Sequence, residues 1–138
     1  GGSSESVYAW HHLTNAGFIS CSECAGLAPA PATPSAANSP SNANGGVMTI
    51  VFDNLYNNGA LGTGNNVNNL KSGTQIPSNI LAEVDRKIDD GNPQTGTFRF
   101  SSYAAGGTNP AAATCAPLGG GLWLVQAPDA NCGAANLF

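Results

Sequence analysis

Four cysteines constrain the fold of this chain more than any other feature. Cys21 and Cys24 form a Cys-x-x-Cys pattern, and Cys115 and Cys132 lie near the C-terminal end. An even set of cysteines in a small, loop-rich chain is typical of disulfides made in an oxidising compartment. Three pairings are possible. Joining Cys21 to Cys24 and Cys115 to Cys132 is the simplest because each closes a local loop, but spacing alone does not decide the connectivity.

The composition favours one globular domain, residues 1–138, with a weakly charged surface. Charged residues make up 9% of the sequence, whereas Gly and Pro number 18 and 9. The formal net charge of -4 removes the electrostatic attraction that phosphate backbones and anionic lipids require. We therefore expect neither nucleic-acid binding nor membrane-surface binding, and no apolar run is long enough for a transmembrane helix.

The first third of the chain is predicted to hold a short helix and a long loop. Apolar residues recur at helical spacing from residue 3 to about residue 15, and Gly17 can end the helix. These apolar residues are Val7, Trp10, Leu13 and Phe18. The tract from Ala28 to Gly46 is rich in Pro, Ala, Ser and Asn, with almost nothing to bury. We expect residues 28–46 to form an exposed, extended loop.

A second helix is the clearest prediction in the remaining sequence. It runs from Ile76 to Asp90, with Ser78 as its N-cap and Gly91 at its end. Apolar residues fall on one face at 3.6-residue spacing, and we expect that face to be buried against the sheet. These residues are Ile80, Leu81, Val84 and Ile88.

Three strands are predicted, at residues 47–52, 97–102 and 122–126, and the first reads as buried. Residues 57–73 are rich in Gly and Asn, and we expect a loop with turns there. This order of elements predicts an α+β domain with a small antiparallel β-sheet, short helices and long loops.

No group of residues predicts catalysis or a bound cofactor. The Cys21–Cys24 pattern lacks the strand–helix setting of a redox motif, and a zinc site would need ligands from His11 or His12, so a structural disulfide is favoured. The two histidines point about 100° apart on a helix and are poorly placed to share a metal. We expect one to pack beside Trp10 and the other to be solvated.

The acidic segment after the second helix contains the residues closest to a metal site. Asp89, Asp90 and Asn92 offer oxygen ligands for calcium around Gly91, but the spacing and the distal Glu of an EF-hand are missing. Hydrogen bonds from these carboxylates to the following turn also explain their position. No metal is therefore expected, and Asp89, Asp90 and Asn92 remain weak calcium candidates.

Two stretches resemble the type IV pilin and type II secretion pseudopilin-like family. Glu5, the Trp10-His11-His12-Leu13 stretch and Ala16-Gly17-Phe18-Ile19 are similar to a pattern that follows the long N-terminal helix in one branch of that family. The segment from Val84 to Gly96 resembles the family's Ile-Asp-x-Lys-Ile-Asp-Asp-Gly-x-Pro-x-Thr-Gly pattern and is the more specific match. Together they cover under a quarter of the chain. The Cys-x-x-Cys departs from the small residues usual at that place.

The resemblance implies a pilin-like headgroup that is a structural subunit of a filament rather than an enzyme. Its partners would be other pilin subunits, in an extracellular pilus or a periplasmic pseudopilus. The family's N-terminal apolar helix is not in this sequence. We expect a removed segment or a separate chain to supply it, with membrane contact only through that helix. An apolar groove should then be exposed where the helix packs.

A secreted adhesin or carbohydrate-binding module is the alternative function. It would use aromatic side chains as a stacking platform. The candidates are Trp10, Tyr56, Tyr103 and Trp123.

Overall fold

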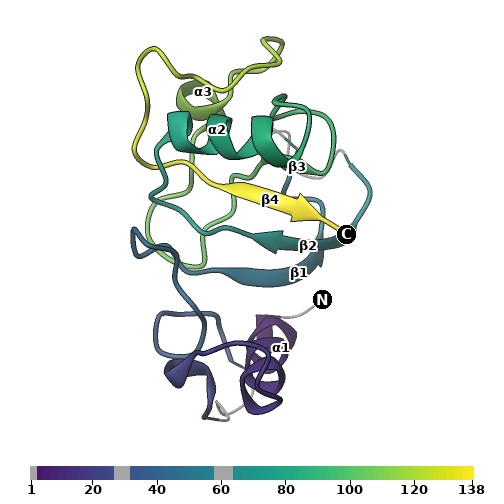
Figure 1. The fold of residues 1–138 in the computed structure, drawn as a ribbon, viewed down its shortest axis with the longest axis vertical. Helices are drawn as coiled ribbons and strands as arrows, with labels where there is room; N and C mark the ends of the chain where they lie inside the picture. The colour runs from purple at the N-terminus through teal and green to yellow at the C-terminus, as the bar shows by residue number, and fades with distance from the viewer. Residues whose placement is uncertain (1–2, 27–31, 58–63) are drawn as a thin grey trace.

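The structure, a computed structural model, describes residues 3–26, 32–57 and 64–138. The elements are α1 (Ser3–Asn15), the 3-10 helix η1 (Ser22–Cys24), β1 (Thr49–Asp53), β2 (Val67–Lys71), α2 (Ser78–Ile88), β3 (Phe98–Phe100), α3 (Ala112–Cys115) and β4 (Ala134–Leu137). Four strands form one antiparallel sheet in the order β1-β2-β4-β3. In Figure 1, α1 and η1 lie beyond β1, and α2 and α3 lie beyond β4. The predicted α+β class with a small antiparallel sheet is confirmed.

The first predicted helix is present as α1, and Gly17 ends it. Gly17 has φ 77°, a conformation that glycine adopts without steric cost. Its N–H donates to the Thr14 carbonyl at 3.0 Å, and the Phe18 N–H donates to the Leu13 carbonyl at 3.0 Å. These two bonds make a Schellman ending. The same turn leaves Phe18 exposed, although its spacing had placed it with the buried apolar residues.

Helix α1 covers the outer edge of β1. The Ile50 N–H donates to Ser6 Oγ at 3.1 Å, and Trp10 Nε1 donates to the Met48 carbonyl at 3.1 Å. Both bonds satisfy backbone groups that an edge strand would otherwise present to another chain. In the described residues, no helix is long and apolar enough to cross a membrane.

The strand predicted at residues 47–52 is present but is not buried throughout, and β2 was not predicted from the sequence. β1 is an edge strand, so Phe52 remains 49% exposed. β2 lies in the stretch predicted as loop, because pairing with β1 and β4 overrides the low strand propensity of Asn68 and Asn69. The expected turns at Asn57–Gly59 and Gly62–Gly64 lie largely in residues 58–63, outside the described residues.

The prediction of a strand at residues 122–126 is wrong. In that segment Trp123 is buried, while Leu122 and Val125 are exposed on either side. The fourth strand is instead β4, in the tail beyond Cys132. Its Ala134 and Ala135 are fully buried, because small side chains fit beneath the helices and loops that cover the sheet.

The loop prediction for residues 28–46 is only partly correct. Residues 27–31 lie outside the described structure. Beyond them Ala32, Pro34 and Ser39 are buried, so this tract packs onto the domain rather than extending into solvent. Asn42 explains part of this packing, since its Nδ2 donates to the carbonyls of Ser72 and Thr74 at 2.9 and 2.8 Å.

One face of the sheet carries a buried ion pair. Lys71 on β2 is 1% exposed, and its Nζ lies 2.8 Å from Asp53 Oδ1. Asn69 Nδ2 donates to the same carboxylate oxygen at 3.1 Å, and the Tyr103 ring lies 5.7 Å from Lys71 Nζ. Burial lowers the pKa of Lys71, and the Asp53 carboxylate opposes that shift. The pair therefore joins the edge strand β1 to its neighbour β2 on this face.

Candidate functional site: the apolar face of α2 and the acidic turn

Helix α2 turns a different face to the core from the one its apolar residues predict. Ser78, Leu81, Ala82 and Asp85 are buried, whereas Ile80 and Ile88 are 49% and 60% exposed and Val84 is half-buried. Of the four residues expected to line the buried face, only Leu81 does so fully. Ser78 is the first helical residue, after Pro77, so its predicted N-cap role is also wrong.

Two polar contacts hold α2 in this orientation. Ser78 Oγ donates to the Leu124 carbonyl at 2.6 Å, and Trp123 Nε1 donates to Asp85 Oδ2 at 2.7 Å. Both partners belong to the segment beyond α3. A buried polar group is costly unless it is hydrogen-bonded, so these bonds select the rotation that buries Ser78 and Asp85. The apolar residues on the neighbouring face are left outside.

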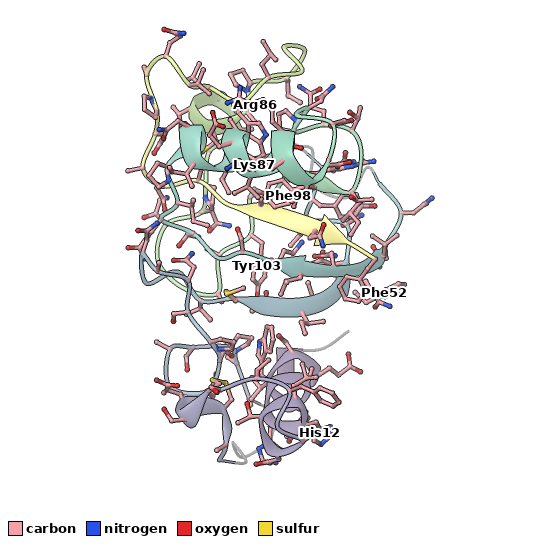
Figure 2. All side chains as sticks on the ribbon, viewed as in Figure 1. His12, Phe52, Arg86, Lys87, Phe98 and Tyr103 are labelled. Carbon is pink, nitrogen blue, oxygen red and sulfur yellow. A yellow bond between two sulfur atoms is a disulfide. The ribbon has the colours of Figure 1, made fainter. Side chains whose placement is uncertain are left out.

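An apolar groove of about 290 Å³ runs beside that outer face. Its apolar walls come from Ile76, Ile80, Leu81, Val84 and Phe98. Residues 42–44 and Ser72 form the other rim. Figure 2 shows Phe98 between α2 and the sheet, with Arg86 and Lys87 on the helix nearby. We refer to Ile80, Val84, Ile88 and this groove as the α2 apolar face.

The acidic turn follows α2 and connects it to β3. Carboxylate oxygens of Asp85, Asp89 and Asp90 all lie within 4.8 Å of one another. Asp85 Oδ1 accepts from the Gly91 N–H at 3.0 Å. Asp89 Oδ2 accepts from the N–H groups of the first residues of the next strand, Thr97 and Phe98.

The side chains of Asp90 and Asn92 are also hydrogen-bonded within the turn. Asp90 accepts from the Asn92 N–H at 2.8 Å and from Thr95 Oγ1, and these bonds lower the pKa of Asp90, with Thr95 the larger cause. Asn92 Oδ1 accepts from the Gln94 N–H at 3.0 Å. Two of the three calcium candidates, Asp89 and Asp90, are thus brought together with Asp85, and side-chain oxygens of all three candidates accept from backbone N–H groups. Burial raises the pKa of Asp85, a fourth member that the sequence analysis missed.

Gly96 is required where the turn closes. It has φ 66°, and a Cβ at this position would lie 2.1 Å from Asp89 Oδ2. Any larger residue would displace the carboxylate that caps the start of β3. The segment that carries the family resemblance is therefore a closed turn that fixes the end of α2 relative to the sheet.

The four cysteines form two local disulfides, Cys21–Cys24 and Cys115–Cys132. No cysteine is left as a thiolate for redox or zinc chemistry in this state. His11 is half-buried and its Nδ1 lies 3.1 Å from the Cys24 carbonyl, while His12 is exposed. Two disulfides are typical of proteins outside the cytoplasm, in oxidising compartments.

The aromatic residues proposed as a stacking platform do not form one. Trp10, Tyr56 and Trp123 are buried and Tyr103 is half-buried. Tyr56 and Tyr103 instead lie over cationic side chains, those of Arg99 and Lys71. A carbohydrate-binding function would need another surface.

No protein-family model, curated protein or solved structure matches this chain. Its function must be argued from the geometry of the described residues and from the resemblance carried by α1 and the acidic turn. That geometry offers an apolar face without a partner among the described residues and carboxylates that already have partners.

Proposed function

We propose that this chain is a structural subunit of an extracellular filament of the type IV pilin or pseudopilin kind, with no catalytic site of its own. One observation carries the proposal: α2 exposes Ile80 and Ile88 beside an apolar groove, although the neighbouring face of the helix is packed against the core. Apolar side chains grouped in this way on a stable domain mark a surface that another molecule covers.

The chemistry of the groove favours an apolar helix as its occupant. Its walls are almost entirely aliphatic or aromatic, and the row formed by Ile80, Val84 and Ile88 runs along the axis of α2 at four-residue spacing. Such a row packs against a partner helix through ridges and grooves. The apolar helices at the core of a pilus would supply that partner, and the polar residues 42–44 would form the rim.

The acidic turn supports this role by holding the α2 apolar face in place. Asp85 joins α2 to Trp123, and Asp89 joins the end of α2 to the start of β3. The residues that resemble the pilin pattern are thus the ones that orient the proposed contact surface. Two disulfides suit a subunit exposed on the outside of a cell or in the periplasm.

Cryo-electron microscopy of filaments sheared from the native cells, with mass spectrometry of their chains, tests the proposal. We expect this chain to surround a core of apolar helices, with α2 facing that core. The same data would show whether helix and headgroup belong to one polypeptide or two. Finding the chain only as a monomer in the medium would contradict the proposal.

A pair of matched variants tests the surface itself. Ile80→Ser with Ile88→Ser removes the α2 apolar face, while Leu118→Ser with Leu122→Ser removes two equally large, exposed side chains elsewhere. We expect the first pair to reduce the yield of sheared filaments with unchanged cellular levels of the chain. The second pair should leave the filament yield near wild type. Equal loss in both, or in neither, would argue against the α2 apolar face.

A further inference from the structure

A second cavity, lined by small and neutral polar residues, lies where four loop segments meet at the end of the sheet at which β2 ends and β4 begins. Its volume is about 680 Å³. The turn at Asn44, the segment Thr74–Gln75, the loop Gly106–Thr108 and the segment Ala130–Asn131 each form part of its wall. Loops that converge on one end of a rigid sheet are a common place for a binding site. This cavity is separate from the α2 apolar face, apart from Asn44 on the shared rim.

The cavity wall is held in place by the protein itself. Asn131 Nδ2 donates to the Thr108 carbonyl at 3.0 Å, and Asn131 Oδ1 accepts from the Gln75 N–H at 3.3 Å. Ile76 and Cys132 exchange two backbone hydrogen bonds at 3.0 and 3.1 Å, and Cys132 is joined to Cys115. Three of the four wall segments are thus tied to one another. The surface that a ligand contacts is therefore preformed, and little conformational entropy would be lost in ordering it on binding.

The groups that line the cavity are neutral and able both to donate and to accept hydrogen bonds. The carboxamides of Asn44 and Gln75 and the hydroxyl of Thr108 have no hydrogen-bond partner in the described parts of the chain. No carboxylate, ammonium, guanidinium or imidazole is among the lining groups. Asp129 is close to the lining residues in sequence, but its carboxylate already accepts hydrogen bonds from the Asn131 N–H and from Thr114 Oγ1.

Gln75 is held in an unfavourable backbone conformation at this cavity. Its φ is 66°, and it is the one non-glycine residue with positive φ in the described parts of the chain. Glycine or asparagine would adopt this conformation more readily. Strained residues cluster at binding sites, where the side chain they position has a use. For Gln75, the group placed for binding would be the carboxamide, because this side chain makes no hydrogen bond that stabilises the fold.

We infer that this cavity binds an uncharged saccharide through carboxamide, hydroxyl and backbone groups. Sugar hydroxyls both donate and accept, as do the free carboxamides of Asn44 and Gln75. A charged ligand would find no counter-ion in the wall. A peptide would need apolar pockets for its side chains, and the cavity offers only Ala130 and small residues. This inference goes beyond the filament role and does not depend on it.

Without an aromatic ring to stack on, binding at one site should be weak, with a Kd on the order of 1 mM. Repetition of the site along a filament, which rests on the proposed function, would raise the effective affinity through multivalency. The test therefore uses the isolated chain, so that its result is independent of assembly.

The experiment is a titration of the ¹⁵N-labelled chain with maltotriose and with N,N′,N″-triacetylchitotriose, both uncharged, followed by amide chemical shifts. A short uncharged Gly-Ser peptide is titrated in parallel. We expect at least one of the saccharides to shift the amide signals of Gly106, Gly107 and Thr108, with little change elsewhere. Asn44→Ala combined with Gln75→Gly should weaken that binding by about tenfold or more. Asn136→Ala, an exposed carboxamide on β4 outside the cavity, is the control and should bind as wild type.

The chosen variants separate binding from folding. Asn44 has a side chain without a partner in the described structure, and glycine at residue 75 relieves the positive φ, so both should leave the spectrum of the rest of the domain unchanged. No cavity shifts with either saccharide would overturn the inference. So would equal binding by the double variant, or shifts of these signals by the peptide alone.

Discussion

The helices pack on the sheet in two groups, and the hydrophobic cores of the two groups differ in size. We call α1, η1 and the core they make with β1 the α1 side, and α2, α3 and the core they make with β3 and β4 the α2 side. The hydrophobic cluster of the α1 side has three buried residues, Trp10, Cys21 and Cys24, with partly buried neighbours. The α2 side has nine: Leu81, Ala82, Phe98, Phe100, Cys115, Ala116, Trp123, Cys132 and Ala134.

The side with the larger core also exposes more apolar surface. Of the eight large apolar residues that are exposed in the described residues, five belong to α2 or to the segment after α3. They are Ile80, Ile88, Leu118, Leu122 and Val125. These five residues are not exposed for want of a core on their side of the sheet, because the α2 side has the larger of the two cores. In α2, the face that stabilises the fold is therefore different from the face proposed to contact another molecule.

The largest expected effect is that of Trp123→Ala. Trp123 packs against Phe98 and Phe100 with ring centroids 6.3 and 6.4 Å away, and it donates to Asp85. Its loss should lower the free energy of unfolding by about 3–5 kcal/mol and leave the Asp85 carboxylate without its indole donor. Trp10→Ala should cost less, because it removes a smaller cluster at the edge of the sheet.

The two tryptophans also report on each side separately, because the chain has only two. In Trp10→Ala, fluorescence of Trp123 should keep its native wavelength and should report an almost unchanged urea midpoint. In Trp123→Ala, the Trp10 signal should shift as well, since the sheet that α1 packs on would be lost. A clearly lower urea midpoint of the Trp123 signal in Trp10→Ala would show that the two sides unfold as one unit.

The disulfides should differ in the same direction. Cys115–Cys132 closes a sequence separation of 17 and Cys21–Cys24 one of 3. The chain-entropy estimate is about 3 kcal/mol for the longer loop and about 2 kcal/mol for the shorter one. We expect Cys115→Ala with Cys132→Ala to lower the melting temperature more than Cys21→Ala with Cys24→Ala. If the first pair melts like wild type, the C-terminal disulfide does not stabilise the tail.

Local signals in the sequence predicted α1, the centre of α2, β3 and the favoured cysteine pairing. They failed where a distant residue decides the outcome. Ser78 and Asp85 are buried because of partners 46 and 38 positions away, and no helical pattern contains that information. β2 and β4 were missed because asparagine and alanine have weak strand propensity, and pairing with neighbouring strands makes up for it.

The candidate site was predicted in outline only. Asp89, Asp90 and Asn92 were identified as a cluster of oxygen ligands, and their hydrogen bonds to the turn were foreseen as the alternative. The exposure of Ile80 and Ile88 was not, because helical periodicity shows which residues share a face but not which way the face points. The strain at Gln75 has no signal in composition or spacing.

Asp89→Ala tests the link between the α2 side and the sheet. It removes the acceptor for the Thr97 and Phe98 N–H groups, and we expect a loss of about 1–2 kcal/mol in the free energy of unfolding. Urea denaturation at neutral pH measures it. Glu83→Ala, on the exposed face of the same helix, is the control and should be close to neutral. Similar losses in the two variants would mean that the turn does not depend on this cap.

Two carboxyl groups of the acidic turn should change the free energy of unfolding with pH in opposite directions. The hydrogen bonds from Thr95 and Asn92 hold the pKa of Asp90 below its usual range, so this carboxyl binds fewer protons in the folded state than in the unfolded state. The stabilisation that Asp90 contributes to the folded state is fully present above the pKa that this group has in the unfolded chain. It is lost as the pH falls through the lower pKa of the folded state. Asp85 acts oppositely, because its raised pKa makes protonation favour the folded state. Asp90→Asn should therefore flatten the acid loss of stability, as measured by urea midpoints from about pH 6 to about pH 3. An unchanged acid slope would show that Asp90 is not responsible.

The smallest expected effect belongs to Ile88→Ser. Ile88 is 60% exposed at the last turn of α2, so its replacement should cost less than about 1 kcal/mol and leave the melting temperature nearly unchanged. Leu81→Ala, on the buried face of the same helix, should cost about 2–5 kcal/mol. Thermal unfolding of the two variants side by side measures the difference between the faces. Because folding does not need Ile88, a loss of filaments in the Ile80 and Ile88 variant would have to come from contacts with another molecule. A large drop in melting temperature for Ile88→Ser would instead make this residue part of the core and remove the basis for a contact surface on α2.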